Sequence, residues 1–165
     1  MLTAILTVQE ELLTFIPNVQ LSFLLVFAYG ATVGILDGTL IVLVHVIIDN
    51  LIMNSFTPYV MIPMLIGWEV ALILGYLTRN RKEYVVSIFG ALAGFIYCML
   101  FWGSTVLFYK IDPYAYLISD IPFEVVLIVC NVITILFLYK PLVNIINMYY
   151  PKRCNDVYSD NLINN

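Results

Sequence analysis

The sequence predicts an all-α membrane protein, a bundle of about six transmembrane helices of which the first is short or incomplete. Composition, hydropathy and length lead to this fold class. Hydrophobic residues make up 62% of the 165 residues, charged residues only 11%, and the mean hydropathy is +0.98. Soluble domains carry about 25% charged residues. The chain is long enough for about six spans of roughly 20 residues, which leaves no room for a separate soluble domain.

Uninterrupted apolar runs mark the expected spans. These runs cover residues 2–16, 20–36, 38–53, 58–78, 84–109 and 122–140. The first run carries Gln9, Glu10 and Glu11, which are costly at bilayer depth unless they face protein or water. We therefore expect an interfacial helix or a shortened span there. Residues 1–150 are predicted to form a single transmembrane helical domain, and residues 151–165 a polar cytoplasmic tail.

Basic residues predict the orientation of the bundle. With six spans, all but one of them fall on one side: Arg79, Arg81, Lys82, Lys140, Lys152 and Arg153. Lys110 falls on the other side. Because positively charged loops stay in the cytoplasm, we expect a multi-pass protein of the cell membrane with a cytoplasmic C-terminus. The segments around residues 17–20, 49–59 and 109–120 then share the outer face.

Several function classes are disfavoured. The net charge of −4 comes from few, thinly spread charges, so we expect no nucleic-acid partner. Cysteine spacing indicates neither a disulfide framework nor a zinc site. Without a P-loop or a Gly-rich phosphate cradle, we expect no bound nucleotide, and no cofactor or metal. The only histidine, His45, lies in LIVLVHVIIDN without a catalytic arrangement around it. We therefore expect no enzyme, and a hydrogen bond inside the bundle for His45.

Amide and aromatic side chains collect at the expected outer end. Asn18 and Gln20 lie in the first outer loop, Tyr59 opens the fourth run and Trp102 lies near the end of the fifth. They suit a solvated rim with an aromatic interfacial belt. They equally suit a pocket for a polar, ring-bearing small molecule, because amides supply hydrogen bonds and rings supply stacking.

The last run adds two polar residues. Glu124 and Asn131 are seven residues apart, so they share one face of a helix. Glu124 could cap the helix after Pro122, and Asn131 could hydrogen-bond a neighbouring helix. Alternatively both line a binding site, with Glu124 accepting a hydrogen bond or pairing with a cation. Glu69, within the fourth run, should face the bundle interior.

Small residues indicate close helix packing. Gly30, Gly34 and Gly38 recur every four residues, a spacing that lets helix backbones approach each other inside the bundle or in a partner. Asp37, between the last two glycines, favours a tight turn there, because a carboxylate and two flexible residues suit a loop.

Three sequence elements resemble a known family. FIPNVQ precedes the second run, FTPYVM opens the fourth, and IPFEVVLIVCNVITILFLYKPL forms the last. Together they resemble the substrate-binding S component of energy-coupling factor (ECF) transporters, from about Phe15 to Leu142. The resemblance implies a six-helix protein in the lipid bilayer that captures a vitamin or related micronutrient from outside. It would pass this ligand inward after docking on a transmembrane coupling protein and two ATPase subunits.

The resemblance also implies roles for individual residues. The expected substrate-binding residues are Asn18, Gln20, Tyr59, Trp102, Glu124 and Asn131. By the resemblance the expected docking residues are Thr3, Ala4 and Thr7 in the first helix, and the four-residue spacing of small residues adds Gly30 and Gly34. Relatives carry a histidine where this sequence has Leu127, and an alanine pair where its first helix has Ala4 alone. The alternative to a transport subunit is a membrane-embedded assembly or scaffold protein, which needs only the helical packing.

Overall fold

A computed structural model describes residues 1–13 and 21–150, which form six helices and no strand. The helices are α1 (Leu2–Leu13), α2 (Ser22–Thr32), α3 (Ile35–Ile52), α4 (Pro58–Leu77), α5 (Glu83–Tyr109) and α6 (Pro113–Tyr149). The predicted fold class, a helical membrane bundle, is confirmed. The predicted tail, residues 151–165, lies outside the described residues.

Four of these helices, α3 to α6, are long and apolar enough to cross a membrane, which makes the chain a multi-pass membrane protein. The first two helices are shorter. With 12 and 11 residues, α1 and α2 extend only about 18 and 17 Å at a rise of 1.5 Å per residue, against a hydrocarbon core of about 30 Å. The short first helix was expected from the sequence. The second run was expected to span the membrane, and its helix is too short to do so.

The short helix α2 lies in the core of the bundle. Every residue from Ser22 to Thr32 except Ala31 is buried, as expected of a helix that is apolar on all sides. Its backbone lies directly against α4, since a Cβ atom added to Gly30 would lie 2.3 Å from the Leu72 carbonyl oxygen. A Cβ atom on Gly75 would lie 2.5 Å from the Phe27 carbonyl oxygen. The small-residue spacing therefore serves packing inside this chain.

The turn between α2 and α3 falls earlier than the sequence suggested. Gly34 has φ +93°, a left-handed value that a glycine adopts without strain. Asp37 lies in the first turn of α3 instead of in the loop, where its carboxylate complements the positive end of the helix dipole. Gly38 is a helical residue whose missing side chain leaves room for Leu72.

Helix α6 is much longer than the predicted run of residues 122–140. It has 37 residues and includes Pro122 and Pro141. The segment before Pro122, expected as an outer loop, is helical because a strong start signal precedes it. The Asp112 side chain accepts a hydrogen bond of 3.0 Å from the Tyr114 backbone N–H, and Pro113 occupies the first turn.

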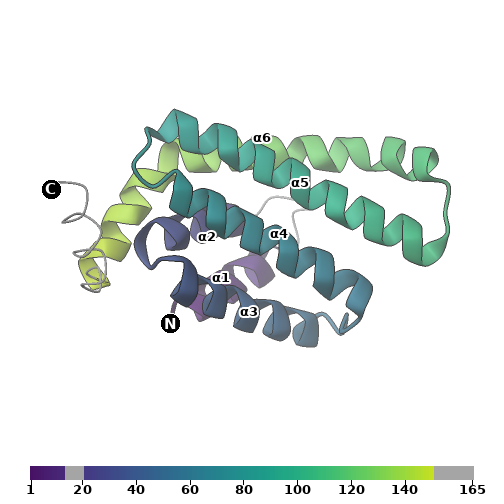
Figure 1. The fold of residues 1–165 in the computed structure, drawn as a ribbon, viewed down its shortest axis with the longest axis horizontal. Helices are drawn as coiled ribbons and strands as arrows, with labels where there is room; N and C mark the ends of the chain where they lie inside the picture. The colour runs from purple at the N-terminus through teal and green to yellow at the C-terminus, as the bar shows by residue number, and fades with distance from the viewer. Residues whose placement is uncertain (14–20, 151–165) are drawn as a thin grey trace, which may run out of the picture.

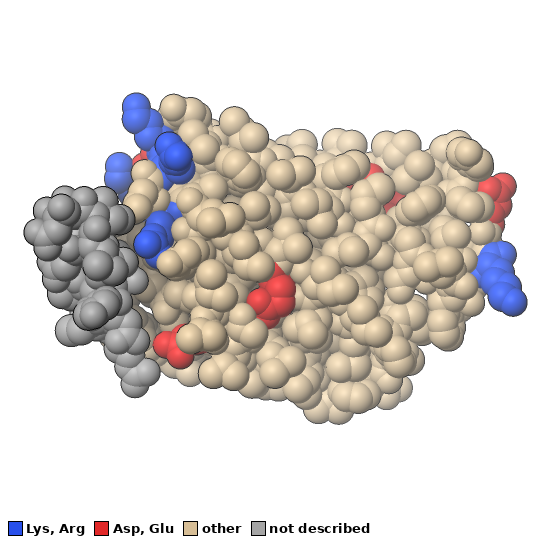
Figure 2. Space-filling view, viewed as in Figure 1, with Lys and Arg blue, Asp and Glu red and all other residues tan. Residues whose placement is uncertain are grey.

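The helices are arranged so that α5 and α6 extend past the others at the end opposite the N-terminus (Figure 1). Lysine and arginine side chains gather at the end that holds the turn between α4 and α5, and one lies at the opposite end (Figure 2). Lys140 of α6 pairs with Glu83 at the start of α5, with 3.0 Å between Nζ and Oε1. Of the basic residues grouped by the sequence, the four that the structure describes, Arg79, Arg81, Lys82 and Lys140, thus share one end of the molecule.

Candidate ligand-binding site

The interface between α5 and α6 holds two of the predicted binding residues. Small residues on α5 allow a close approach, since a Cβ atom on Gly90 would lie 2.3 Å from Ile135 Cδ1. A Cβ atom on Gly94 would lie 2.8 Å from Asn131 Nδ2. Asn131 is completely buried in this interface, and Glu124 is 8% exposed.

Both side chains carry polar atoms without a hydrogen-bond partner among the described residues. These atoms are Glu124 Oε1 and both amide atoms of Asn131. An unpaired buried polar group costs about 1–3 kcal/mol. Glu124 does not cap a helix start, because α6 begins at Pro113, about three turns earlier. Nor does Asn131 bond a neighbouring helix in the described structure, so the two structural explanations open at the sequence level do not account for them.

Trp102 lies at the end of the same interface where α6 begins. Its Nε1–H donates a hydrogen bond of 3.2 Å to the carbonyl oxygen of Pro113 at the start of α6. On α5, Gly94 faces Asn131 and lies about two turns before Trp102. Trp102 and Asn131 therefore lie along the same interface, and Glu124 lies between Pro113 and Asn131 on α6.

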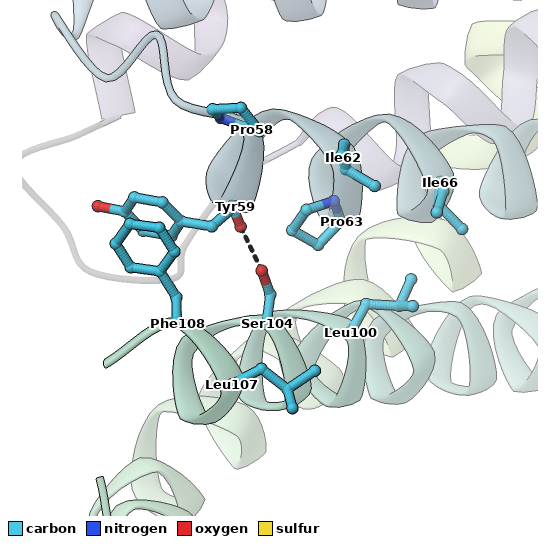
Figure 3. Close-up of a pocket in the computed structure, with 9 residues that line it drawn as sticks. All are labelled: Pro58, Tyr59, Ile62, Pro63, Ile66, Leu100, Ser104, Leu107 and Phe108. Carbon is cyan, nitrogen blue, oxygen red and sulfur yellow. Dashed lines mark hydrogen bonds between the residues drawn. The ribbon is translucent and has the colours of Figure 1, made fainter. Parts of the chain in front are cut away.

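Tyr59 lies in a different interface, between α4 and α5. Its ring stacks on Phe108 with 4.1 Å between centroids, and its hydroxyl lies 2.7 Å from the hydroxyl of Tyr109. A groove of about 500 Å³ runs beside it (Figure 3). The groove is lined by Pro58, Tyr59, Ile62, Pro63, Ile66, Leu100, Ser104, Leu107 and Phe108. The structure therefore separates Tyr59 from Glu124 and Asn131.

In this groove a side chain from α5 replaces a backbone hydrogen bond that α4 lacks. Pro63 has no N–H and so cannot make the helical hydrogen bond to the Tyr59 carbonyl oxygen. The Ser104 hydroxyl donates to that oxygen instead (Figure 3). The hydroxyls of Tyr59 and Ser104 are therefore both engaged within the protein, and every other side chain that lines the groove is apolar.

The remaining predicted residues are spread over the molecule. Asn18 and Gln20 lie outside the described residues. Thr7 and Gly30 are buried inside the bundle, so they do not present a surface to a partner in this structure. Gly34 and Thr3 are half-buried, and Ala4 is exposed. Of the five proposed docking residues, Ala4 is thus the one most open to the surroundings.

A buried polar cluster joins α1 to α3, and the sequence did not reveal it. The Thr7 hydroxyl lies 3.0 Å from His45 Nδ1, and His45 Nε2 lies 3.0 Å from Glu10 Oε2. His45 is completely buried. The contact of Nε2 with Glu10 is short but is not an aligned hydrogen bond. The expected hydrogen bond of His45 inside the bundle is confirmed.

The same cluster fixes the start of α2. The Ser22 hydroxyl donates a hydrogen bond of 3.0 Å to Glu10 Oε2 and accepts one from Gln9 Nε2. Gln9 Oε1 accepts a bond of 3.1 Å from the Leu21 backbone N–H. Polar residues that looked costly in the first run are therefore paired within the protein. Their position in an apolar run was a signal of burial, but it did not identify their partners.

Two further acidic residues lie in the bundle. Glu69 is half-buried and accepts a hydrogen bond of 2.9 Å from the Thr39 hydroxyl of α3, so it faces a neighbouring helix as expected. Asp49 is 7% exposed, and its Oδ1 has no hydrogen-bond partner within the described part of the chain. Among the described residues, no group of three or more His, Cys, Asp or Glu side chains could hold a metal ion.

The fold and these sites define a multi-pass helical membrane protein with polar side chains buried between its helices. Comparison with known proteins does not narrow this class, because no family model, no curated protein and no solved structure matches the chain.

Proposed function

We propose that this chain is the substrate-capture subunit of an ECF-type uptake transporter in the cell membrane, with its C-terminus in the cytoplasm. It binds a vitamin or related micronutrient at the outer face and delivers it inward with a separate coupling protein and two ATPase subunits. Its activity is binding and transfer, without a chemical reaction. The proposal rests on the resemblance of three sequence elements to this family and on the interface between α5 and α6.

The observation that carries the proposal is the set of three unpaired polar atoms on one face of α6, Glu124 Oε1 and the two amide atoms of Asn131. A ligand that offers complementary donors and acceptors would recover the free energy lost by burying them unpaired. An amide also suits the edge of a heterocyclic ring, because it donates and accepts side by side. Trp102 supplies an aromatic surface at the outer part of the same interface.

The basic end of the molecule supports the proposed orientation. Arg79, Arg81 and Lys82 follow α4, and Lys140 is exposed near the end of α6. With this end in the cytoplasm, Trp102 lies toward the outer face. A ligand arriving from outside would then meet Trp102 before it reaches Glu124 and Asn131.

The test is the substitution Asn131→Leu, which keeps the side-chain shape and removes both polar atoms. We expect the ligand-free protein to be as stable as the wild type or more stable, because an unpaired amide is removed. Binding of the micronutrient, identified by mass spectrometry of the purified protein, should fall by about tenfold or more, equivalent to about 1.4 kcal/mol. The control is Asn144→Leu on the same helix, where the amide is exposed and binding should not change.

The same preparation distinguishes the scaffold alternative. Protein purified in mild detergent from its host's membranes should bring with it a larger membrane protein and two ATPases. If no small molecule and no ATPase co-purify from membranes that contain this machinery, and Asn131→Leu changes only stability, the chain is a structural protein of the membrane and the transport proposal fails.

A further inference from the structure

We propose that the groove between α4 and α5 is a binding site for one phospholipid of the bilayer, with an acyl chain in the groove and the headgroup phosphate beside Lys110. This inference does not depend on the proposed transport function. The groove has a volume of about 500 Å³.

The groove opens onto the surface that faces the membrane. Four of its lining residues are more than two fifths exposed: Ile62, Ile66, Leu107 and Phe108. They project from two neighbouring spanning helices, α4 and α5, toward the same space (Figure 3). In a bilayer, hydrocarbon surrounds this surface, so an acyl chain reaches the groove without crossing water.

The chemistry of the lining selects an apolar occupant. The only side-chain polar atoms in it are the hydroxyls of Tyr59 and Ser104, and both are paired within the protein. The carbonyl oxygen that Pro63 leaves without its helical partner is also occupied, by Ser104. A polar ligand would lose its hydrogen bonds to water and find as side-chain partners only these two hydroxyls, which already bond within the protein. A hydrocarbon chain loses nothing and gains close contacts along the groove.

The length of the groove corresponds to one leaflet. From Leu100 to Phe108 the axis of α5 rises about 12 Å, at 1.5 Å per residue. Half of the hydrocarbon core is about 15 Å. One acyl chain from a single leaflet therefore fits along the groove, with its methyl end near Ile66 and Leu100.

The outer end of the groove has the side chains expected at a membrane interface. The hydroxyls of Tyr59 and Tyr109 are hydrogen-bonded to each other there. Tyrosine is enriched at the level of lipid headgroups. Lys110 follows Tyr109 and ends α5 in a left-handed conformation with φ 52°. It is exposed and directly follows α5. Lys110 follows the last lining residue, Phe108, by two positions, and an ammonium group within reach of this end of the groove would complement the phosphate of a phospholipid.

Native mass spectrometry of the protein in mild detergent, titrated with phosphatidylglycerol, tests the site. We expect one tightly retained lipid per chain. Leu100→Trp fills the groove and should reduce this retention by about tenfold, while the matched control Leu92→Trp, at an exposed position on the same helix, should leave it unchanged. Lys110→Gln should remove the preference for phosphatidylglycerol over phosphatidylcholine.

A second measurement does not depend on whether the variants fold. A phospholipid with a photoreactive group on its acyl chain should label the wild-type segments 58–66 and 100–108 more than the rest of α5. Equal retention by Leu100→Trp and Leu92→Trp, or labelling spread evenly over the apolar surface, would overturn the proposal. So would a partner protein helix found crosslinked in the groove in place of lipid.

Discussion

The Tyr59 carbonyl oxygen, which Pro63 cannot bond and Ser104 does, gives a quantitative prediction. Ser104→Ala removes the hydroxyl that donates to the Tyr59 carbonyl oxygen. This oxygen then has no helical partner, because residue 63 is a proline. An unsatisfied carbonyl in apolar surroundings costs about 1–3 kcal/mol, so the free energy of unfolding should fall by about this amount.

The cost should depend on Pro63. In the Pro63→Ala background, the new backbone N–H supplies the missing helical bond to Tyr59, and Ser104→Ala should cost less than about 1 kcal/mol. The coupling energy between the two positions is then about 1–2 kcal/mol. Chemical unfolding of the purified protein in detergent, for the wild type, both single variants and the double variant, measures this energy.

The matched control is Ser119→Ala on α6. The Ser119 hydroxyl also donates to a backbone carbonyl, that of Tyr116 at 2.7 Å, but it is exposed. Water replaces the lost hydroxyl there, so we expect almost no change in stability and no coupling to Pro63. If Ser104→Ala costs the same with proline and with alanine at position 63, the assignment of the hydroxyl as the substitute for the missing N–H is refuted.

Two further predictions concern packing and the polar cluster. Gly30→Ala places a Cβ atom against the backbone of Leu72 and should lower the free energy of unfolding by about 1–3 kcal/mol. The control Gly103→Ala, with no atom within 4 Å, should instead raise it by about 0.5–1 kcal/mol. A Gly30→Ala variant that is as stable as the wild type in thermal unfolding would contradict the packing of α2. His45→Leu removes the contact between Nε2 and Glu10 and leaves this partly exposed carboxylate with the Ser22 hydroxyl as a partner, so it should cost about 1–3 kcal/mol; an unchanged midpoint in urea would refute a stabilising role for this contact.

The sequence predicted the parts of the fold that follow from local composition. Apolar runs located each of the six helices, and the scarcity of charge identified the bilayer as the solvent. The ends of the helices were less predictable. The Asp112 and Pro113 start signal extended α6 through Pro122, since Pro122 interrupts only local hydrogen bonds and packing against α5 holds the helix.

The sequence predicted which residues of the candidate site are buried. It did not predict which of them lie together. The cost of an amide and a carboxylate in an apolar run showed that Asn131 and Glu124 are buried. Their lack of partners could not be known, because partners come from another helix. Tyr59 was grouped with them as an aromatic residue at the outer end, and the structure assigns it to the groove between α4 and α5.

By itself, the sequence determined the class of protein and the basic end of the bundle. Hydropathy and charge suffice for this because each side chain's preference for water or bilayer does not depend on its neighbours in the fold. Only the tertiary structure decided which polar groups meet. Thr7 and His45 are 38 residues apart in the chain and 3.0 Å apart in space. In an apolar bundle each such group must find its partner in a neighbouring helix, and which helix is the neighbour depends on the packing of all six.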